Sequence, residues 1–245
     1  MDRDDTPVGR VLSRREVLTV LGASGLALLA GGTQEALARA DSRLRFPACV
    51  ARPEQTAGPY FVDAKLNRSD IRSDAASGEV KEGAPLDLVL AVSALRAGGC
   101  APLAGAHVDI WHCDATGVYS GVEDPGFKTV GQTFLRGYQL TDDAGEVRFR
   151  TIYPGWYPGR AVHIHFKIRT DPGSARGHEF TSQLYFDEAL TGRVFSRMPY
   201  AGKTGKPDRN ADDEIFARGG DQLLLAPKSA GDGYAARFEV GLQLT

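Results

Sequence analysis

One short segment, residues 161–168, constrains the fold of this chain more than any other. Apolar side chains stand at positions 162, 164, 166 and 168, and His163 and His165 occupy positions between them. Such alternation is typical of a β-strand, because successive side chains of a strand point to opposite faces. We therefore expect a strand that buries its apolar face and directs both imidazoles to one point on the other face.

Comparable alternation predicts that most of the remaining chain is also made of strands. Apolar residues alternate with polar or small ones at 86–92, 147–149 and 238–244. Turn signals at 97–99 and 143–145 predict hairpins. Helical periodicity is limited to short pieces around 187–191 and 212–218. With 245 residues, 42% of them hydrophobic, the chain is long enough for one substantial core. We predict a mainly β fold, namely a single-domain antiparallel β-sandwich with long loops and few short helices.

The first forty residues have the composition of an export signal. Arg14 and Arg15 precede an apolar run rich in glycine and alanine at 17–32, and small-residue cleavage sites follow at Ala38 and Ala40. The run is short for a membrane span and is diluted with glycine. We therefore predict a twin-arginine signal peptide over residues 1–40, cleaved near Ala38 or Ala40, and a mature domain over residues 41–245. This signal predicts a periplasmic or extracellular location.

The charge of the chain gives no sign of a polyanionic partner. The formal net charge is -2, and residues of both signs are mixed along the sequence. Nucleic-acid and anionic-lipid surfaces are usually recognised by clustered basic residues. We expect neither nucleic acid nor, after signal cleavage, a membrane as a partner.

The three cysteines allow one disulfide and one free thiol. They are Cys49, Cys100 and Cys113, and an exported protein can keep a disulfide. Cys113 falls in a strand-like segment and is expected to be a small buried residue. Cys49 and Cys100 lie at loop-like ends of segments, so we predict that they pair.

Two tyrosines occupy loops that can approach the histidine strand. Tyr157 lies in a turn of prolines and glycines at 154–159, and Tyr119 follows the strand-like segment 108–113. Taken with His163 and His165, they form a set of two phenols and two imidazoles. The alternative is that the histidines merely line a sheet face and the tyrosines are ordinary loop residues. The other histidines, His107, His112 and His178, are expected to be structural.

Several segments resemble the intradiol ring-cleavage dioxygenases, the family of catechol and protocatechuate dioxygenases. They are WHCDATGVYSG, FLRGYQLTDDAGEVRFRTIYPGWYPGR, HIHFKI and TSQLYF, in this order. The segment QTAGPY at 55–60 resembles the one that borders the substrate pocket in the protocatechuate enzymes, which implies a substrate-binding role for Gly58, Pro59 and Tyr60. The resemblance extends from about residue 49 to residue 216.

The resemblance implies a ferric iron, Fe(3+), held by four side chains, Tyr119, Tyr157, His163 and His165. It also implies that Tyr157 is displaced by the substrate and that Arg160 and Gln183 act in catalysis. The ligand types agree with this metal, since a phenol with a pKa of about 10 binds as phenolate only beside a strongly Lewis-acidic cation. Ferrous oxygenases instead use two histidines and a carboxylate, and no carboxylate accompanies the histidine pair at a suggestive spacing.

The implied reaction cleaves a catechol-type ring, using O2, between the two hydroxyl-bearing carbons to give a muconate-type diacid. Two alternatives stay open at this point. One is a non-catalytic exported β-sandwich that serves as a binding module. The other is a zinc or copper site built on His163 and His165. For single residues, Arg160 can also be a solvated loop charge, Gln183 an ordinary strand residue, and Arg136 is unassigned.

Overall fold

The computed structural model describes residues 50–96, 99–173 and 177–244. These residues all belong to one compact unit, Phe46–Thr245. The predicted signal peptide and Cys49 lie outside the described residues. No described helix is both long and apolar enough to cross a membrane.

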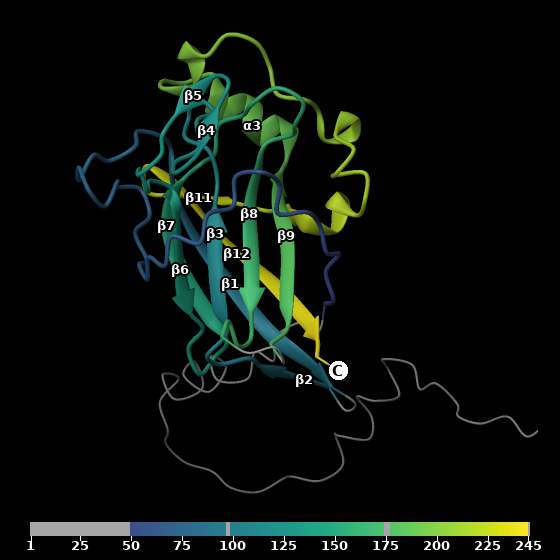
Figure 1. Ribbon diagram of the computed structural model, residues 1–245. Coiled ribbons are helices and arrows are strands. Elements are labelled where there is room, and N and C mark those ends of the chain that lie inside the picture. Colours follow the sequence, from purple (N-terminus) through teal and green to yellow (C-terminus); the bar gives the residue numbers. More distant parts are fainter. Residues whose placement is uncertain (1–49, 97–98, 174–176, 245) are drawn as a thin grey trace, which may run out of the picture. The chain divides into compact units, whose positions relative to one another are not determined.

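Two five-stranded sheets form the framework of the unit (Figure 1). In the first sheet, β1 pairs with three neighbours and β11 extends the edge; its strands are β1 (Pro85–Arg96), β2 (Gly99–Pro102), β7 (Glu146–Ile152), β11 (Lys228–Ala230) and β12 (Gly233–Gln243). The second sheet has the order β10-β9-β8-β3-β6; its strands are β10 (Leu224–Leu225), β9 (Glu179–Phe186), β8 (His163–Arg169), β3 (His107–Trp111) and β6 (Arg136–Leu140). A small separate hairpin joins β4 (Glu123–Asp124) to β5 (Phe127–Lys128).

The hydrophobic core takes one face of each sheet. From β1 it includes the alternating residues Leu86, Leu88, Leu90 and Val92, and from β8 it includes Ile164, Phe166 and Ile168, all at most 1% exposed. Removing this apolar surface from water is the main stabilising contribution to such a domain. The predicted mainly β sandwich is confirmed, because the predicted alternating segments supply the strands that bury this core.

The sequence analysis expected antiparallel strands, but two pairs of strands are parallel. β12 runs parallel to β1, with Tyr234 opposite Leu86, and β10 runs parallel to β9. The period of two that identifies a strand is the same in both orientations, so it carries no information on direction.

The turn at 143–145 forms, but it does not close a hairpin. Gly145 has φ +74° and its N–H donates to Asp142 O at 2.8 Å, as a tight turn requires. The strands on either side, β6 and β7, belong to different sheets. The turn is therefore a corner between the two layers. The other predicted hairpin is confirmed, since β1 and β2 pair antiparallel with Arg96 opposite Gly99.

One of the two predicted helical pieces is an α-helix. α3 (Glu188–Phe195) begins after Asp187, whose carboxylate accepts a hydrogen bond from Leu190 N at 2.9 Å. The prediction around 212–218 is wrong. That stretch follows a 3-10 turn, Asn210–Asp212, and continues as turns. The side chain of Asp213 accepts from the backbone N–H groups of Ile215 and Phe216, as an N-cap residue does. Gly219, at φ +92°, adopts the left-handed conformation that ends a helix, so the stretch does not extend into one.

The cysteines agree with the predicted pairing as far as the structure describes them. Cys100 on β2 is disulfide-bonded. Cys113 is a free thiol, 2% exposed, and burial raises its pKa to about 12. Cys113 is therefore an inert buried residue.

Candidate metal centre

The outer face of the second sheet carries the histidine pair. On β8 the apolar residues face the core, and His163 and His165 point away from it, where they are 3% and 1% exposed. Their Nε2 atoms lie 3.0 Å apart. Trp111 on β3 is opposite His165 in the register, and the two rings stack with centroids 4.9 Å apart and planes 4° apart. The stacking fixes the orientation of the His165 ring.

The two tyrosines reach the same point from two loops. The hydroxyl oxygens of Tyr119 and Tyr157 each lie 3.5 Å from His163 Nε2. The Tyr119 ring is 1% exposed, and its centroid lies 5.7 Å from that of Tyr157. All four side chains that the sequence analysis assigned to the metal thus converge on one position.

The loop that carries Tyr119 is held by the side chain of Asp114. Its Oδ1 accepts hydrogen bonds from the N–H groups of Thr116 and Val118 and from the Thr116 hydroxyl, at 2.7–3.0 Å. Asp114 N in turn donates to Val118 O at 2.8 Å. This closed turn, which the sequence signals as Asp-Ala-Thr-Gly, directs Tyr119 inward.

Hydrogen bonding leaves His163 Nε2 free to bind a metal. His163 Nδ1 lies 2.6 Å from Ala161 O, and only a protonated Nδ1 can donate to a carbonyl. Nε2 therefore carries a lone pair toward the nitrogen of His165 and the two phenols. A ring N–H bonded to a backbone carbonyl is the usual way in which a protein orients a metal-binding histidine.

Burial keeps all four side chains neutral in the absence of a cation. Desolvation lowers the pKa of His163 to about 3, and it lowers that of His165 well below its usual value. Desolvation also raises the pKa of Tyr119 well above its ordinary value and raises that of Tyr157, which the charge of Arg160 partly opposes. Neutral imidazoles are the metal-binding form, and the phenols become phenolates only where a cation compensates the buried charge.

The distances between the donor atoms fit a single ion. Two ligands bound about 2.1 Å from one ion, at angles of about 90–120°, lie roughly 3.0–3.6 Å apart, and the measured separations are 3.0 and 3.5 Å. Within the described part of the chain, no three His, Cys, Asp or Glu side chains form a metal cluster. The two phenols are the donors that lie beside the histidine pair. Two phenolate oxygens with two imidazoles suit ferric iron, a hard cation of high charge.

Arg160 and Gln183, the two predicted catalytic residues, adjoin Tyr157. The side chain of Arg160 is only 13% exposed, with Nη1 3.4 Å from the Tyr157 hydroxyl and Nη2 donating to Gln183 Oε1. Gln183 is fully buried on β9, opposite His165, and its Nε2 donates to Thr56 O at 3.0 Å. Arg160 is thus not a solvated loop charge.

The predicted substrate segment, Gly58 to Tyr60, lies over the donor atoms. Gly58 has φ +65°, and a Cβ there would lie 3.5 Å from His165 Cε1. The Tyr60 ring stacks on Tyr119 with centroids 4.5 Å apart, and its hydroxyl donates to Asp124 at 2.8 Å. Pro59 is exposed. The segment therefore forms one wall beside the metal position.

Two residues that hold this site were missed in the sequence. Asp213 forms the buried ion pair of Arg160, and only a wrong helix was predicted around it. Arg136, left unassigned, is 3% exposed and donates to Ser120 Oγ at 2.8 Å and to Tyr60 O at 3.3 Å. It ties the wall segment to the Tyr119 loop. Arg136 lies opposite Trp111 in the register of β6 and β3, a pairing that the sequence alone does not show.

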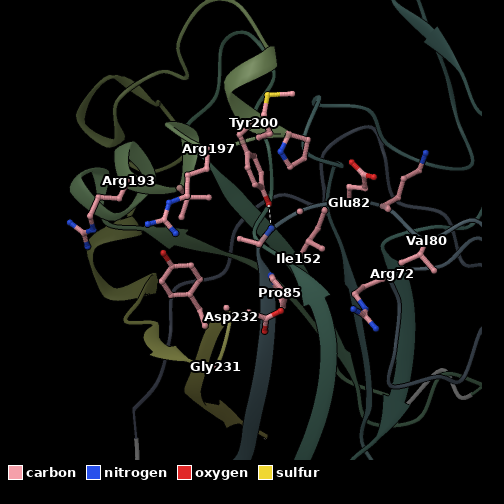
Figure 2. A pocket seen from close by; sticks show the side chains of 18 of the residues that line it. Arg72, Val80, Glu82, Pro85, Ile152, Arg193, Arg197, Tyr200, Gly231 and Asp232 are labelled. Carbon is pink, nitrogen blue, oxygen red and sulfur yellow. Dashed lines mark hydrogen bonds between the residues drawn. The ribbon is translucent and has the colours of Figure 1, made fainter.

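Two cavities lie outside this centre. One of about 370 Å³ is lined by Glu54, Gln55, Thr56, Ile215 and Arg218. Gln183, a predicted site residue, donates a hydrogen bond to Thr56 O. Figure 2 shows another, of about 970 Å³, where the Tyr200 hydroxyl accepts from Ala84 N. None of the predicted site residues lines either cavity.

Comparison with known proteins identifies the family. A family described as "Dioxygenase" matches residues 56–195. The chain is 34% identical over 104 residues to a chlorocatechol 1,2-dioxygenase of Pseudomonas putida, covering 35% of this chain and 36% of that protein. It is 33% identical over 123 residues to a protocatechuate 3,4-dioxygenase beta chain of Burkholderia cepacia, covering 46% and 51%. The alignments thus span about a third to a half of these relatives.

A solved structure agrees over a larger share of the chain. The intradiol ring-cleavage dioxygenase from Tetranychus urticae is 29% identical, with a TM-score of 0.68, and the match covers 80% of this chain and 95% of that one. The family match over residues 56–195 includes the segments that carry the four donors. The chain belongs to the intradiol ring-cleavage dioxygenase family.

Proposed function

We propose that this protein is a non-haem iron(III) dioxygenase that opens the ring of catechol-type substrates between the two hydroxyl-bearing carbons, producing muconate-type diacids. The observation that carries the proposal is the convergence of Tyr119, Tyr157, His163 and His165 on one position. Membership of the dioxygenase family supports it. Neither a non-catalytic module nor a zinc or copper site on the two histidines is favoured, since neither accounts for the two phenols beside them.

Each residue of the centre has a distinct task in this reaction. Ferric iron, when bound, would act as a Lewis acid that holds the catechol as its dianion and makes the ring reactive toward O2. Tyr119 and the two histidines are buried and fixed, which suits permanent ligands. Tyr157 is less buried, which suits the ligand that leaves and takes a proton from the substrate at its phenolate oxygen.

Arg160 is placed to stabilise negative charge on the substrate oxygens. Its Nη1 lies 3.4 Å from the Tyr157 hydroxyl, the position that a substrate oxygen would take. A guanidinium keeps its charge at every relevant pH and costs no reorganisation when charge develops nearby. Gln183 accepts from Nη2 and holds the plane of the guanidinium.

The centre has features that suit a substituted catechol. Gly58 presents no side chain toward His165. Only six positions separate Tyr157 from His163 in the sequence, so the connection between these donors adds little bulk. We propose catechols with ring substituents as substrates alongside catechol itself.

We also propose export through the twin-arginine route to the periplasm or the exterior. Arg14 and Arg15 before the apolar run support it. The disulfide at Cys100 supports it as well, because disulfides persist mainly in oxidising compartments.

Product analysis tests the reaction. Purified protein is incubated with a panel of catechols under 18O-labelled O2, and the products are identified by mass spectrometry. We expect muconate-type diacids that carry both labelled atoms, and a visible absorption band from tyrosinate bound to iron(III). Semialdehyde products, or incorporation of a single labelled atom, would contradict the proposal.

A further inference from the structure

The ammonium group of Lys203 joins the two loops that carry the tyrosine donors. Lys203 follows the 3-10 turn Tyr200–Gly202, and its Nζ donates to Thr116 O and to Trp156 O, each at 2.5 Å. It also lies 4.4 Å from the centroid of the Trp156 ring. Thr116 precedes Tyr119 in one loop, and Trp156 directly precedes Tyr157 in the other. One side chain thus bridges the backbones of both loops.

The two loops meet closely enough for this bridge to set their separation. Gly117 has φ +90°, and a Cβ there would lie 2.1 Å from Trp156 O and 2.3 Å from Lys203 Nζ. A Cβ on Gly155 would lie 2.3 Å from Asp114 O. No side chain therefore separates the two backbones at this contact. Two carbonyl oxygens directed at one place repel each other unless a donor lies between them, and the ammonium supplies that donor.

We propose that Lys203 is a positioning residue that fixes the distance between the Tyr119 and Tyr157 loops and, through it, the capacity of the centre to hold its metal. The identity of the metal as ferric iron rests on the proposed function, whereas the link between the loops does not. An exposed lysine three residues later, Lys206, has no hydrogen-bond partner among the described residues and offers a matched control.

The link is tested first without metal. Hydrogen–deuterium exchange is measured on iron-free wild type, Lys203→Met, Lys203→Arg and Lys206→Met. Lys203→Met keeps the apolar stem and removes every donor. It should raise exchange at least about tenfold in the peptides that contain Tyr119 and Tyr157, since a lost charge-assisted hydrogen bond shifts a local opening equilibrium by that factor or more. Lys206→Met should exchange like the wild type.

The consequence for the metal is tested on the iron-loaded proteins. The rate at which a chelator removes iron should rise about tenfold or more in Lys203→Met, and the visible band should shift. The rate of iron removal and the band both depend on the positions of the two phenol oxygens. Lys203→Arg retains a cation with several donors and should lie between Lys203→Met and the wild type.

The outcomes distinguish a failure of the role proposed for Lys203 from a failure of the proposed dioxygenase function. Unchanged exchange and unchanged iron loss in Lys203→Met would overturn the role of Lys203, even in an active dioxygenase. A wild type that binds no iron would instead contradict the proposed function, while the exchange data would still decide whether Lys203 links the loops. Should Lys203→Met fail to fold, Lys203→Gln, which keeps a shorter neutral donor, replaces it in both measurements with the same expected direction.

Discussion

Arg160 donates from Nε to the carboxylate of Asp213 at 2.9 Å, and this carboxylate has no exposed surface. Asp213 Oδ2 also accepts from Ala161 N at 2.8 Å, and Oδ1 accepts from the backbone of Ile215. Burial alone would raise the pKa of Asp213, but hydrogen bonds from backbone N–H groups and the charge of Arg160 outweigh it, so the pKa lies below its usual value. The carboxylate is therefore charged and fixes the plane of the guanidinium.

Asp213→Asn should reduce turnover without removing the metal. The amide keeps an oxygen acceptor but loses the charge that pairs with Arg160, so the guanidinium is held less firmly. We expect kcat to fall about tenfold or more, with a smaller change in KM, because placement matters most in the transition state. Iron content by metal analysis should stay near that of the wild type. A loss of iron equal to the loss of rate would mean that Asp213 serves the metal and not Arg160.

Arg160→Ala should lower the rate of turnover more than Asp213→Asn does, and it should likewise leave metal binding intact. Removing a single electrostatic group that acts on developing charge costs on the order of a hundredfold in rate. The visible band and the iron content should persist, since Arg160 is not a ligand. The matched control is Arg237→Ala, an arginine on β12 with a 41% exposed side chain, which should leave kcat unchanged. Full activity in Arg160→Ala would show that the assigned role is wrong.

The proposed ligand set predicts a pattern across three substitutions. Tyr119→Phe and His165→Ala each remove a donor atom, so iron content should fall or the visible band should shift. His107→Ala should do neither, because His107 lies on β3 against Asp109 and Arg169, away from the centre. Iron is counted per chain by metal analysis beside the spectrum. If all three variants behave alike, the centre lies elsewhere.

A buried histidine outside the centre predicts a loss of stability in acid. Burial lowers the pKa of His112 to about 4, and its Nε2 lies 2.7 Å from Thr151 Oγ1. Between about pH 6.5 and pH 4 the unfolded chain binds a proton at this residue and the folded protein does not, so stability falls as pH falls. The contribution amounts to roughly 3 kcal/mol at the acid end. Urea denaturation of iron-free protein at several pH values measures it.

The control for this prediction is a variant that lacks the titrating group of His112. His112→Gln removes the titrating group, so the free energy of unfolding should depend less steeply on pH in this range, whatever the absolute stability of the variant. Parallel curves for the variant and the wild type would exclude His112 as the source.

The proposed export route predicts that both arginines of the predicted signal are needed. Replacing Arg14 and Arg15 with lysines should leave the precursor in the cytoplasm, because the twin-arginine pair is what that route requires. Cell fractionation and immunoblotting of the two compartments provide the measurement. Undiminished accumulation outside the cytoplasm would refute this route.

The parts that the sequence predicted are those encoded by local pattern or by the family resemblance. Alternation along β8 was enough to place His163 and His165 on one face. The tyrosines sit in loops without a period, so only the order of motifs led to them. Asp213 and Lys203 act through contacts with residues far away in the chain, and a polar residue in a turn has no pattern that names its partner. Strand direction was missed for the same reason, as it depends on topology and not on side chains.

The parallel pairing of β1 with β12 determines when the domain can become complete. These are the first and last strands of the described unit, and β12 contributes Phe238, Val240 and Leu242 to the core. A ribosome must therefore release nearly the entire unit before β1 gains this neighbour, and such distant pairings form slowly. A route that exports folded proteins suits a domain assembled in this order.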